Sequence, residues 1–103
     1  MQFLVHLQFP VEPFNSYVRD GSIGGKIEKI MASIKPEAAY FTEHHGTRGA
    51  LLVVNVKNAS DIPAIAEPWF LQFEADVEFR IAMTPQDLGK AGLPKLGKTW
   101  GDL

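Results

Sequence analysis

Four short segments of the chain alternate between apolar and polar residues, as strands with one buried face do. These segments are residues 2–9, 38–45, 50–57 and 75–83. Prolines and glycines near their ends are typical terminators of strands. Residues 46–49 join the second and third segments through a short glycine-containing turn, which predicts a β-hairpin.

The hydrophobic spacing changes to three and four residues between the first two strands, which predicts helical structure over residues 14–34. Interior glycine destabilises a helix, so we expect a break at residues 20–25, with Ser22 as the N-cap of the second piece. A second main helix is expected to begin at the capping residue Ser60 and to be kinked or ended by Pro68.

The C-terminal segment carries a strong helix start at Thr84, which is followed by proline and then an acidic residue in the first turn. Two glycines limit this extra helix to about two turns. We therefore predict one domain over residues 1–93 and a C-terminal arm over residues 94–103, with Trp100 as its large apolar anchor.

The predicted order is strand, helix, strand, strand, helix, strand, which gives a ferredoxin-like α+β fold with a four-stranded antiparallel sheet. Both main helices then cover one face of that sheet. The third strand is apolar on both sides, because Leu51 and Val53 oppose the inward-facing set. Leu4, Phe41 and Ala82 are expected to join them on the uncovered face, depending on the register.

An apolar sheet face that no helix covers needs another partner. A second copy of the chain is the simplest cover, and two sheets packed face to face form a dimeric α+β barrel, so we predict a homodimer. The alternative is a monomer in which the C-terminal arm folds over its own sheet.

Composition and charge narrow the function classes. The formal net charge of −2 leaves no basic footprint for nucleic acid and no polybasic membrane anchor. There is no cysteine, which excludes disulfides, thiolate nucleophiles and sulfur-ligated zinc. The N-terminus looks like a strand rather than a signal peptide, and no apolar run could span a membrane, so we expect a cytoplasmic protein.

His6 and Arg80 are the most informative polar pair, because each lies on the predicted uncovered face of neighbouring strands. Histidine exchanges protons near neutral pH, and arginine binds carboxylates through two parallel hydrogen bonds. Both are candidate catalytic residues of a shared cavity. The alternative is structural: Arg80 pairs with Glu78, Asp76 or a partner acid, and His6 is hydrogen-bonded to its neighbours.

Glu43, His44 and His45 resemble a metal cluster, but adjacent strand residues point to opposite faces. No metal site and no cofactor are predicted from them. Glu43 remains a candidate acid or base, and Tyr40 and His44 are candidate substrate-binding residues.

Asn55 and Trp69 complete the candidate substrate-binding set. Trp69 belongs to an aromatic group with Phe70 and Phe73 at the end of the second main helix. Core packing is the favoured interpretation of this group, and a wall of a small-molecule pocket is the alternative.

The segments MQFLVHLQFPVEP, TRGALLVVNVK and AEPWFLQFEADVEFRIAMTPQDL together resemble the dimeric α+β barrel superfamily, closest to small bacterial members that lack an assigned activity. The resemblance extends over nearly the whole chain. More distantly the chain is similar to muconolactone isomerase, with which it shares the opening strand and the aromatic approach to the last strand. No catalytic residue is carried over, and the absence of a helical histidine counts against the haem-degrading barrels.

These observations favour a small-molecule enzyme or binder whose cavity lies between the sheet and the dimer partner. Proton transfer, as in an isomerase, or cofactor-independent oxygenation of a small aromatic or acidic compound would suit such a cavity. The alternative is a non-catalytic structural or regulatory dimer with a barrel filled by its own side chains. A third hypothesis is a protein-binding module that uses the C-terminal arm and Trp100.

Overall fold

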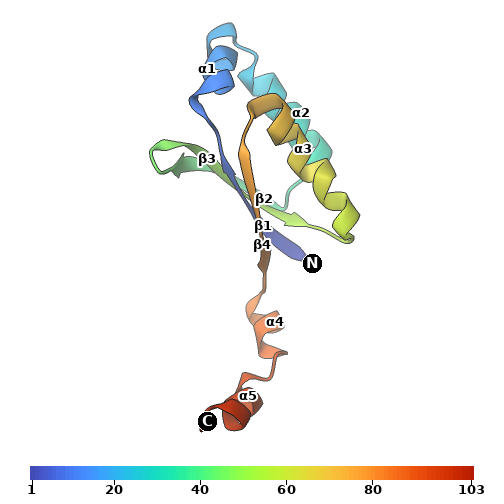
Figure 1. The fold of residues 1–103 in the computed structure, drawn as a ribbon. Helices are drawn as coiled ribbons and strands as arrows, with labels where there is room; N and C mark the ends of the chain where they lie inside the picture. Colours follow the sequence, from blue (N-terminus) through green and yellow to red (C-terminus); the bar gives the residue numbers. More distant parts are fainter.

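A computed structural model describes residues 1–103 and shows an α+β domain with an extended C-terminal segment (Figure 1). Its four strands form one antiparallel sheet in the order β2-β3-β1-β4. The strands are β1 Gln2–Gln8, β2 Ala38–His44, β3 Thr47–Asn55 and β4 Asp76–Ala82. The helices of the domain are α1 Val11–Asp20, α2 Ile23–Ile34 and α3 Ile62–Phe73, with a short 3-10 turn η1 at Ala59–Asp61. The predicted fold class is therefore confirmed at the level of an α+β sheet protein.

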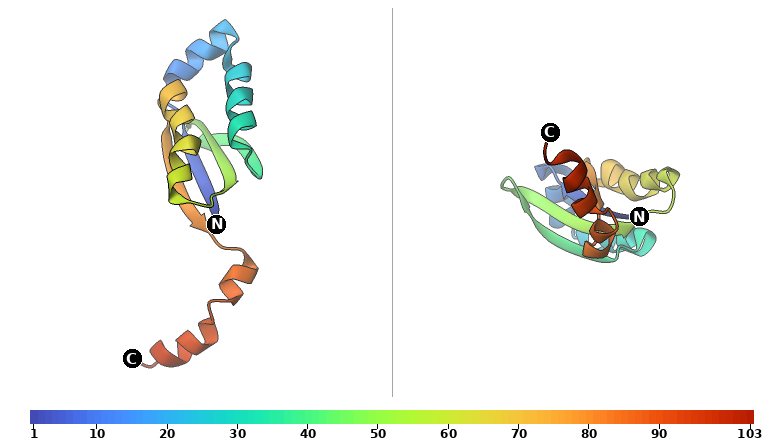
Figure 2. Two further views of the ribbon diagram at one scale, coloured as in Figure 1. Left: turned by 90° about the vertical axis from the view of Figure 1, so that its right-hand side faces the viewer. Right: turned by 90° about the horizontal axis from the view of Figure 1, so that it is seen from below.

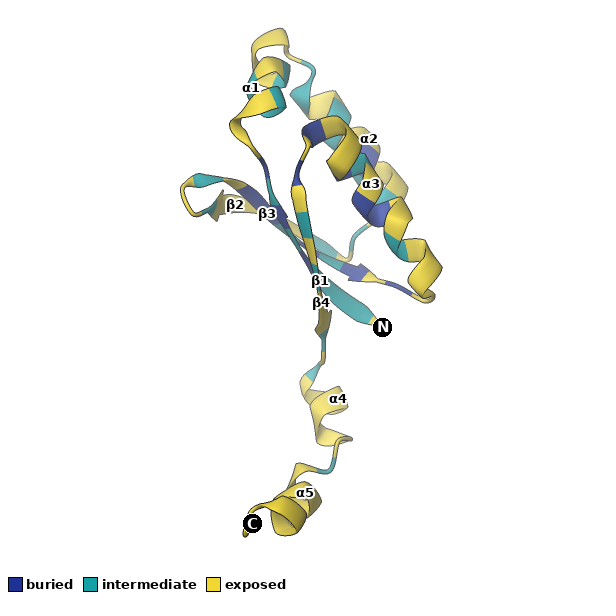
Figure 3. Ribbon diagram, in the orientation of Figure 1, coloured by how far each residue is buried: buried dark blue, intermediate teal, exposed yellow.

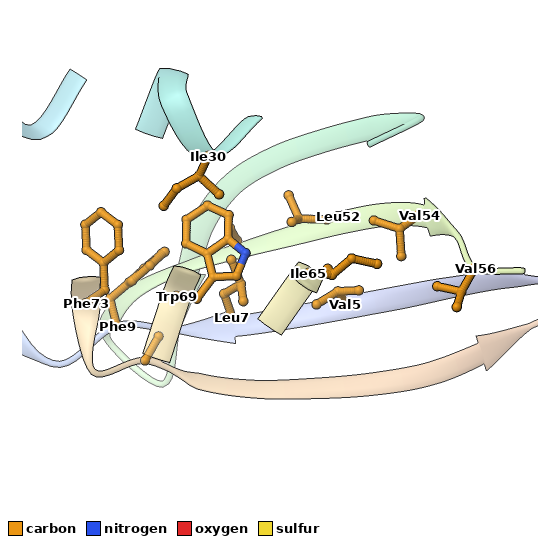
Figure 4. Packing of buried hydrophobic residues seen from close by; sticks show 12 residues of the cluster. Val5, Leu7, Phe9, Ile30, Leu52, Val54, Val56, Ile65, Trp69 and Phe73 are labelled. Atoms are coloured by element: carbon orange, nitrogen blue, oxygen red, sulfur yellow. The ribbon is translucent and has the colours of Figure 1, made fainter. Parts of the chain in front are cut away.

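Helices α2 and α3 lie over one face of the sheet and leave the other face uncovered (Figure 2). The core between the two layers is built from the residues of β1 and β3 that point toward the helices, together with an aromatic group (Figure 4). Trp69, Phe9 and Phe73 are the largest fully buried side chains. Their rings meet edge to face or tilted, at centroid distances of 5.3 to 5.9 Å. Burial of this core is the main contact between the helices and the sheet.

The predicted break in the first helical stretch is confirmed between α1 and α2. Gly21 adopts a left-handed conformation with φ of 80° and ends α1. Ser22 occupies the N-cap position of α2 as predicted, but its hydroxyl makes no capping hydrogen bond. Its backbone N–H instead donates to the carboxylate of Asp20, which orders the corner between the two helices.

Helix α3 departs from the sequence prediction at both ends. The chain first forms η1, where Asp61 accepts a hydrogen bond from the backbone N–H of Asn58, so Ser60 is not the cap. Pro68 does not end the helix either, since α3 continues to Phe73. Packing of Trp69 and Phe73 into the core compensates for the hydrogen bond that the proline cannot donate.

The hairpin between β2 and β3 is tighter than predicted. Its turn consists of His45 and Gly46 alone, with φ of 51° and 81°. Two residues with positive φ match the twist of a hairpin, and they allow β3 to begin at Thr47 rather than at residue 50.

The last 21 residues, Met83–Leu103, form what we call the C-terminal extension. It holds α4 (Pro85–Gly89) and α5 (Leu93–Trp100), and neither helix contains a buried residue (Figure 3). Thr84 caps α4 as predicted, accepting a hydrogen bond from the backbone N–H of Asp87. The extension continues away from the sheet and contributes to a longest dimension of 61 Å. None of the helices combines the length and the apolarity needed to cross a bilayer.

Candidate functional site

The uncovered side of the sheet, which we call the open face, is organised in rows by the strand register. His6 on β1 lies opposite Leu51 of β3 on one side and Glu78 of β4 on the other. Tyr40 of β2 extends this row, because it lies opposite Leu51. In the neighbouring row Arg80 lies opposite Leu4. The register therefore places His6 and Arg80 on the same face and on adjacent strands, as predicted.

A shallow hollow of about 90 Å³ opens on this face around His6. Its side chains are mostly polar, and the open-face contributors are His6, Gln8, His44, Asp76 and Glu78. They come from β1, β2 and β4, so only the folded sheet brings them together. The arrangement combines two imidazoles, which can exchange protons, with two carboxylates.

Gly49 of β3 makes room for His44 in this hollow. Gly49 lies between Thr42 and Gln8 in the register and is buried. A Cβ atom at this position would lie 3.1 Å from the Cβ of His44 and 3.0 Å from the carbonyl oxygen of Leu7. The missing side chain thus permits a close approach of His44 over the strand that separates it from β1.

Arg80 and Glu78 form an ion pair at the edge of the hollow, with 2.8 Å between Nε of Arg80 and Oε1 of Glu78. The hydrogen bond and the positive charge of Arg80 lower the pKa of the Glu78 carboxyl below its usual value, and the nearby His6 and His44 lower it further. Both side chains are more than 60% exposed, so the pair contributes little to stability. The contact uses Nε, and the two terminal amino groups of the guanidinium remain free for another anion.

The rest of the open face is apolar. Leu4, Leu51 and Val53 are half-buried at its centre, although no helix covers them. Tyr40 is 63% exposed at the β2 edge. Ala82 lies on this face as expected, because it pairs with Gln2. Phe41 does not: it pairs with Ala50, so it lies on the side of the helices, and Tyr40 takes its place on the open face.

Two of the predicted site residues lie away from the hollow. Glu43 points to the opposite side of β2, because the alternation places residues 40, 42 and 44 on the open face. Its carboxylate accepts the backbone N–H of Gly46 at 2.7 Å and so stabilises the hairpin turn. Asn55 lies on the open face but at its far end, where it accepts a hydrogen bond from the N-terminal amine of Met1.

Trp69 is also separated from the hollow, because it lies in the core between α3 and the sheet with 0% of its surface exposed (Figure 4). Trp69 therefore cannot line a cavity on the open face. Its position agrees with the favoured interpretation, in which it packs in the core. Its indole N–H is buried without a hydrogen-bond partner.

His44 and His45 meet more closely than strand alternation predicts, since their ring centroids are 4.3 Å apart. The reason is that β2 ends at His44, and His45 already belongs to the turn. No group of three or more histidine, cysteine, aspartate or glutamate side chains is placed so that it could hold a metal ion.

Sequence reasoning did not include Gln8, Asp76 and Glu78 in the site. Their positions in the alternation place them on the same face as His6 and Arg80, which was the available signal. Their convergence depends on the β1–β4 register, in which Gln8 lies opposite Asp76 and His6 opposite Glu78.

Neither a family model nor a curated protein matches the chain. The resemblance to dimeric α+β barrels therefore stays a prediction.

Proposed function

We propose that this chain is a ferredoxin-like, dimeric α+β barrel protein that binds a small acidic molecule on the open face, in a cavity closed by a second protomer. The observation that carries the proposal is the cluster of His6, Glu78 and Arg80 on a sheet face that is otherwise apolar. Charged groups on a surface that requires cover are typical of a site with a few placed polar groups in an apolar pocket.

The size of the hollow supports the need for a partner. Pockets for small molecules usually measure about 300–1,000 Å³, and the hollow of one protomer measures about 90 Å³. A second protomer placed over the open face would add walls to this hollow, and it would remove Leu4, Leu51 and Val53 from water.

Arg80 is the proposed anchor for the acidic group of the ligand, since its two terminal amino groups are free to bind a carboxylate. His6 is the proposed acid or base, because its imidazole lies in the row next to Arg80. His44 and Tyr40 lie on the same face and are proposed to contact the ligand. A reaction of this site would be a proton transfer or a cofactor-independent oxygenation of a small aromatic or acidic compound.

The second candidate function is a non-catalytic dimer whose own side chains fill the barrel. The observation that favours it is that Arg80 already has an acidic partner in Glu78. This candidate predicts that no small carboxylate perturbs the open face at all.

Benzoate is a suitable probe, because it is aromatic and carries one carboxylate. We expect benzoate to shift the NMR signals of His6, His44 and the Arg80 side chain, and we expect Arg80→Gln to weaken its binding by about tenfold or more, as loss of a charged hydrogen bond does. Arg48→Gln is the matched control, since Arg48 contacts Asn15 and Phe14 rather than the hollow. Absence of shifts on the open face, or equal binding by the Arg80 variant, would contradict the proposal.

A further inference from the structure

The C-terminal extension is a folded segment without a place on its own domain. Both α4 and α5 lack buried residues, and the extension projects from the end of β4 in Figure 1 and in the left view of Figure 2. Trp100 is 63% exposed and Leu103 is 91% exposed. Large apolar side chains in this state are unfavourable in water, so the extension requires a surface to cover them.

Helix α5 has the pattern of a docking helix. Leu93, Leu96 and Trp100 follow one another at spacings of three and four residues, which places them on one side of the helix. Helices shorter than about 12 residues are marginal in water unless they pack against something, and α5 has only 8 residues. The apolar side of α5 is therefore expected to form its helix stably only against a partner.

The open face offers a matching surface of the same chain. Leu4, Leu51 and Val53 are apolar and uncovered there. Arg80 of β4 lies opposite Leu4 and neutralises Glu78 through their ion pair. Asp76, opposite Gln8, has no ion-pair partner within the protomer and keeps its negative charge. The extension carries three lysines, Lys90, Lys95 and Lys98, against two aspartates. Helix α5 can therefore match this face both in apolar surface and in charge.

We propose that the two protomers of a dimer exchange their extensions, so that α5 of each lies on the open face of the other. The facing sheet of the partner would cover Leu4 and Val53, while α5 would lie at the His6 end of the open face with its apolar side toward Tyr40 and Leu51. Its lysines would approach Asp76, and the helix would form a wall of the hollow around His6. A second copy is the occupant because the extension leaves the end of β4 without folding back onto its own sheet, while a two-fold exchange covers both apolar surfaces of both chains. The inference rests on the dimer of the proposed function but not on its ligand.

The first experiment compares the association of variants in the full chain. We expect the double variant Leu96→Ser with Trp100→Ala to weaken dimerisation by about a hundredfold or more in sedimentation equilibrium, as loss of two buried apolar side chains predicts. The control Thr99→Ala alters the same helix outside the apolar side and should leave association unchanged. An unchanged association of the double variant would overturn the inference. Neither variant removes a core residue, and circular dichroism verifies the fold.

A second experiment locates the docked helix, because the chain contains no cysteine and single cysteines can be introduced freely. A tagged chain with Thr99→Cys is mixed with an untagged chain carrying Gln8→Cys on the open face, and a short bis-maleimide is added. The control partner carries Ser33→Cys on α2, on the other side of the molecule. We expect a cross-link between the two chains only with the Gln8 variant.

Three results of the cross-linking would overturn the exchange. The first is a link to the Ser33 variant, and the second is a link from position 99 to position 8 only when both cysteines are in one chain. The third is the absence of any link. Failure of the benzoate experiment would leave these results untouched, so the two proposals can fail separately.

Discussion

At the scale of single residues, Arg80 connects the proposed binding site to a measurable pKa. The Arg80 guanidinium lowers the pKa of the Glu78 carboxyl below its usual 4.5. We predict that Arg80→Gln raises the pKa of Glu78 back toward that value, as measured by the NMR pH titration of its side-chain carboxyl carbon. Arg19→Gln should not change it, because Arg19 pairs with Glu12 instead. An unaltered pKa in the Arg80 variant would show that the pair does not form in solution.

The sign of the pH dependence follows from the same shift. Because the pKa of Glu78 is lower in the folded chain, its contribution to stability is present above the unfolded-state pKa and is lost as the pH falls through the folded-state value. Arg80→Gln should reduce this small acidic dependence in urea titrations at different pH values, while His6 and His44 still lower the pKa of Glu78.

Trp69 is the largest of the fully buried side chains in the core. We predict that Trp69→Ala lowers the free energy of unfolding by about 3–5 kcal/mol in urea titrations, because the cavity left by the ring is filled only in part. Trp69→Phe should cost less, since it keeps an aromatic ring and removes the buried indole N–H that has no partner. Phe70→Ala is the control on the same helix, since Phe70 is 41% exposed. A Trp69→Ala variant as stable as the Phe70 variant would contradict this account of the core.

At the scale of elements, two glycines with different surroundings give opposite predictions. Gly49→Ala on β3 should lower the free energy of unfolding, since its Cβ would be forced against the Leu7 carbonyl and His44. Gly25→Ala in α2 meets nothing within 4 Å and should raise that free energy by up to about 1 kcal/mol. Thermal melts of the two variants check the signs. Equal effects would mean that the close approach at Gly49 is not a feature of the folded chain.

The element boundaries show which parts of the structure the sequence could predict. Alternation gave the four strands to within a few residues, and Gly21 and Thr84 marked a helix end and a helix start, because each signal is local. Ser60 and the turn at residues 46–49 were mispredicted. The 3-10 turn and the two-residue hairpin depend on how the flanking elements pack, which local residue types do not determine.

The candidate site was predictable in part for the same reason. Strand alternation and the strand order were enough to predict that His6 and Arg80 lie on one face of adjacent strands. Glu43 lies on the opposite side of β2 from the hollow, because one position of register reverses the face of a strand residue. Trp69 lies in the core, as the favoured interpretation of its apolar helix position predicts. The position of Asp76 beside the hollow could not be predicted from alternation alone, because it depends on the β1–β4 register that places Asp76 opposite Gln8.

At the scale of the whole molecule, one chain exposes two apolar surfaces that it does not cover: the open face and the apolar side of α5. Neither surface belongs to the core between helices and sheet. Both are explained together if the functional unit is a pair of chains. The proposed ligand cavity also depends on this pairing, because the hollow of one protomer is small.

Native mass spectrometry of gently purified protein shows whether two chains form one unit in solution. We predict a species with twice the 11.4 kDa chain mass, and protein that retains its ligand should carry a further mass in whole-number ratio to the protomers. A chain that stays monomeric at micromolar concentration would rule out the pairing, since the open face and α5 would then be left in water without a partner.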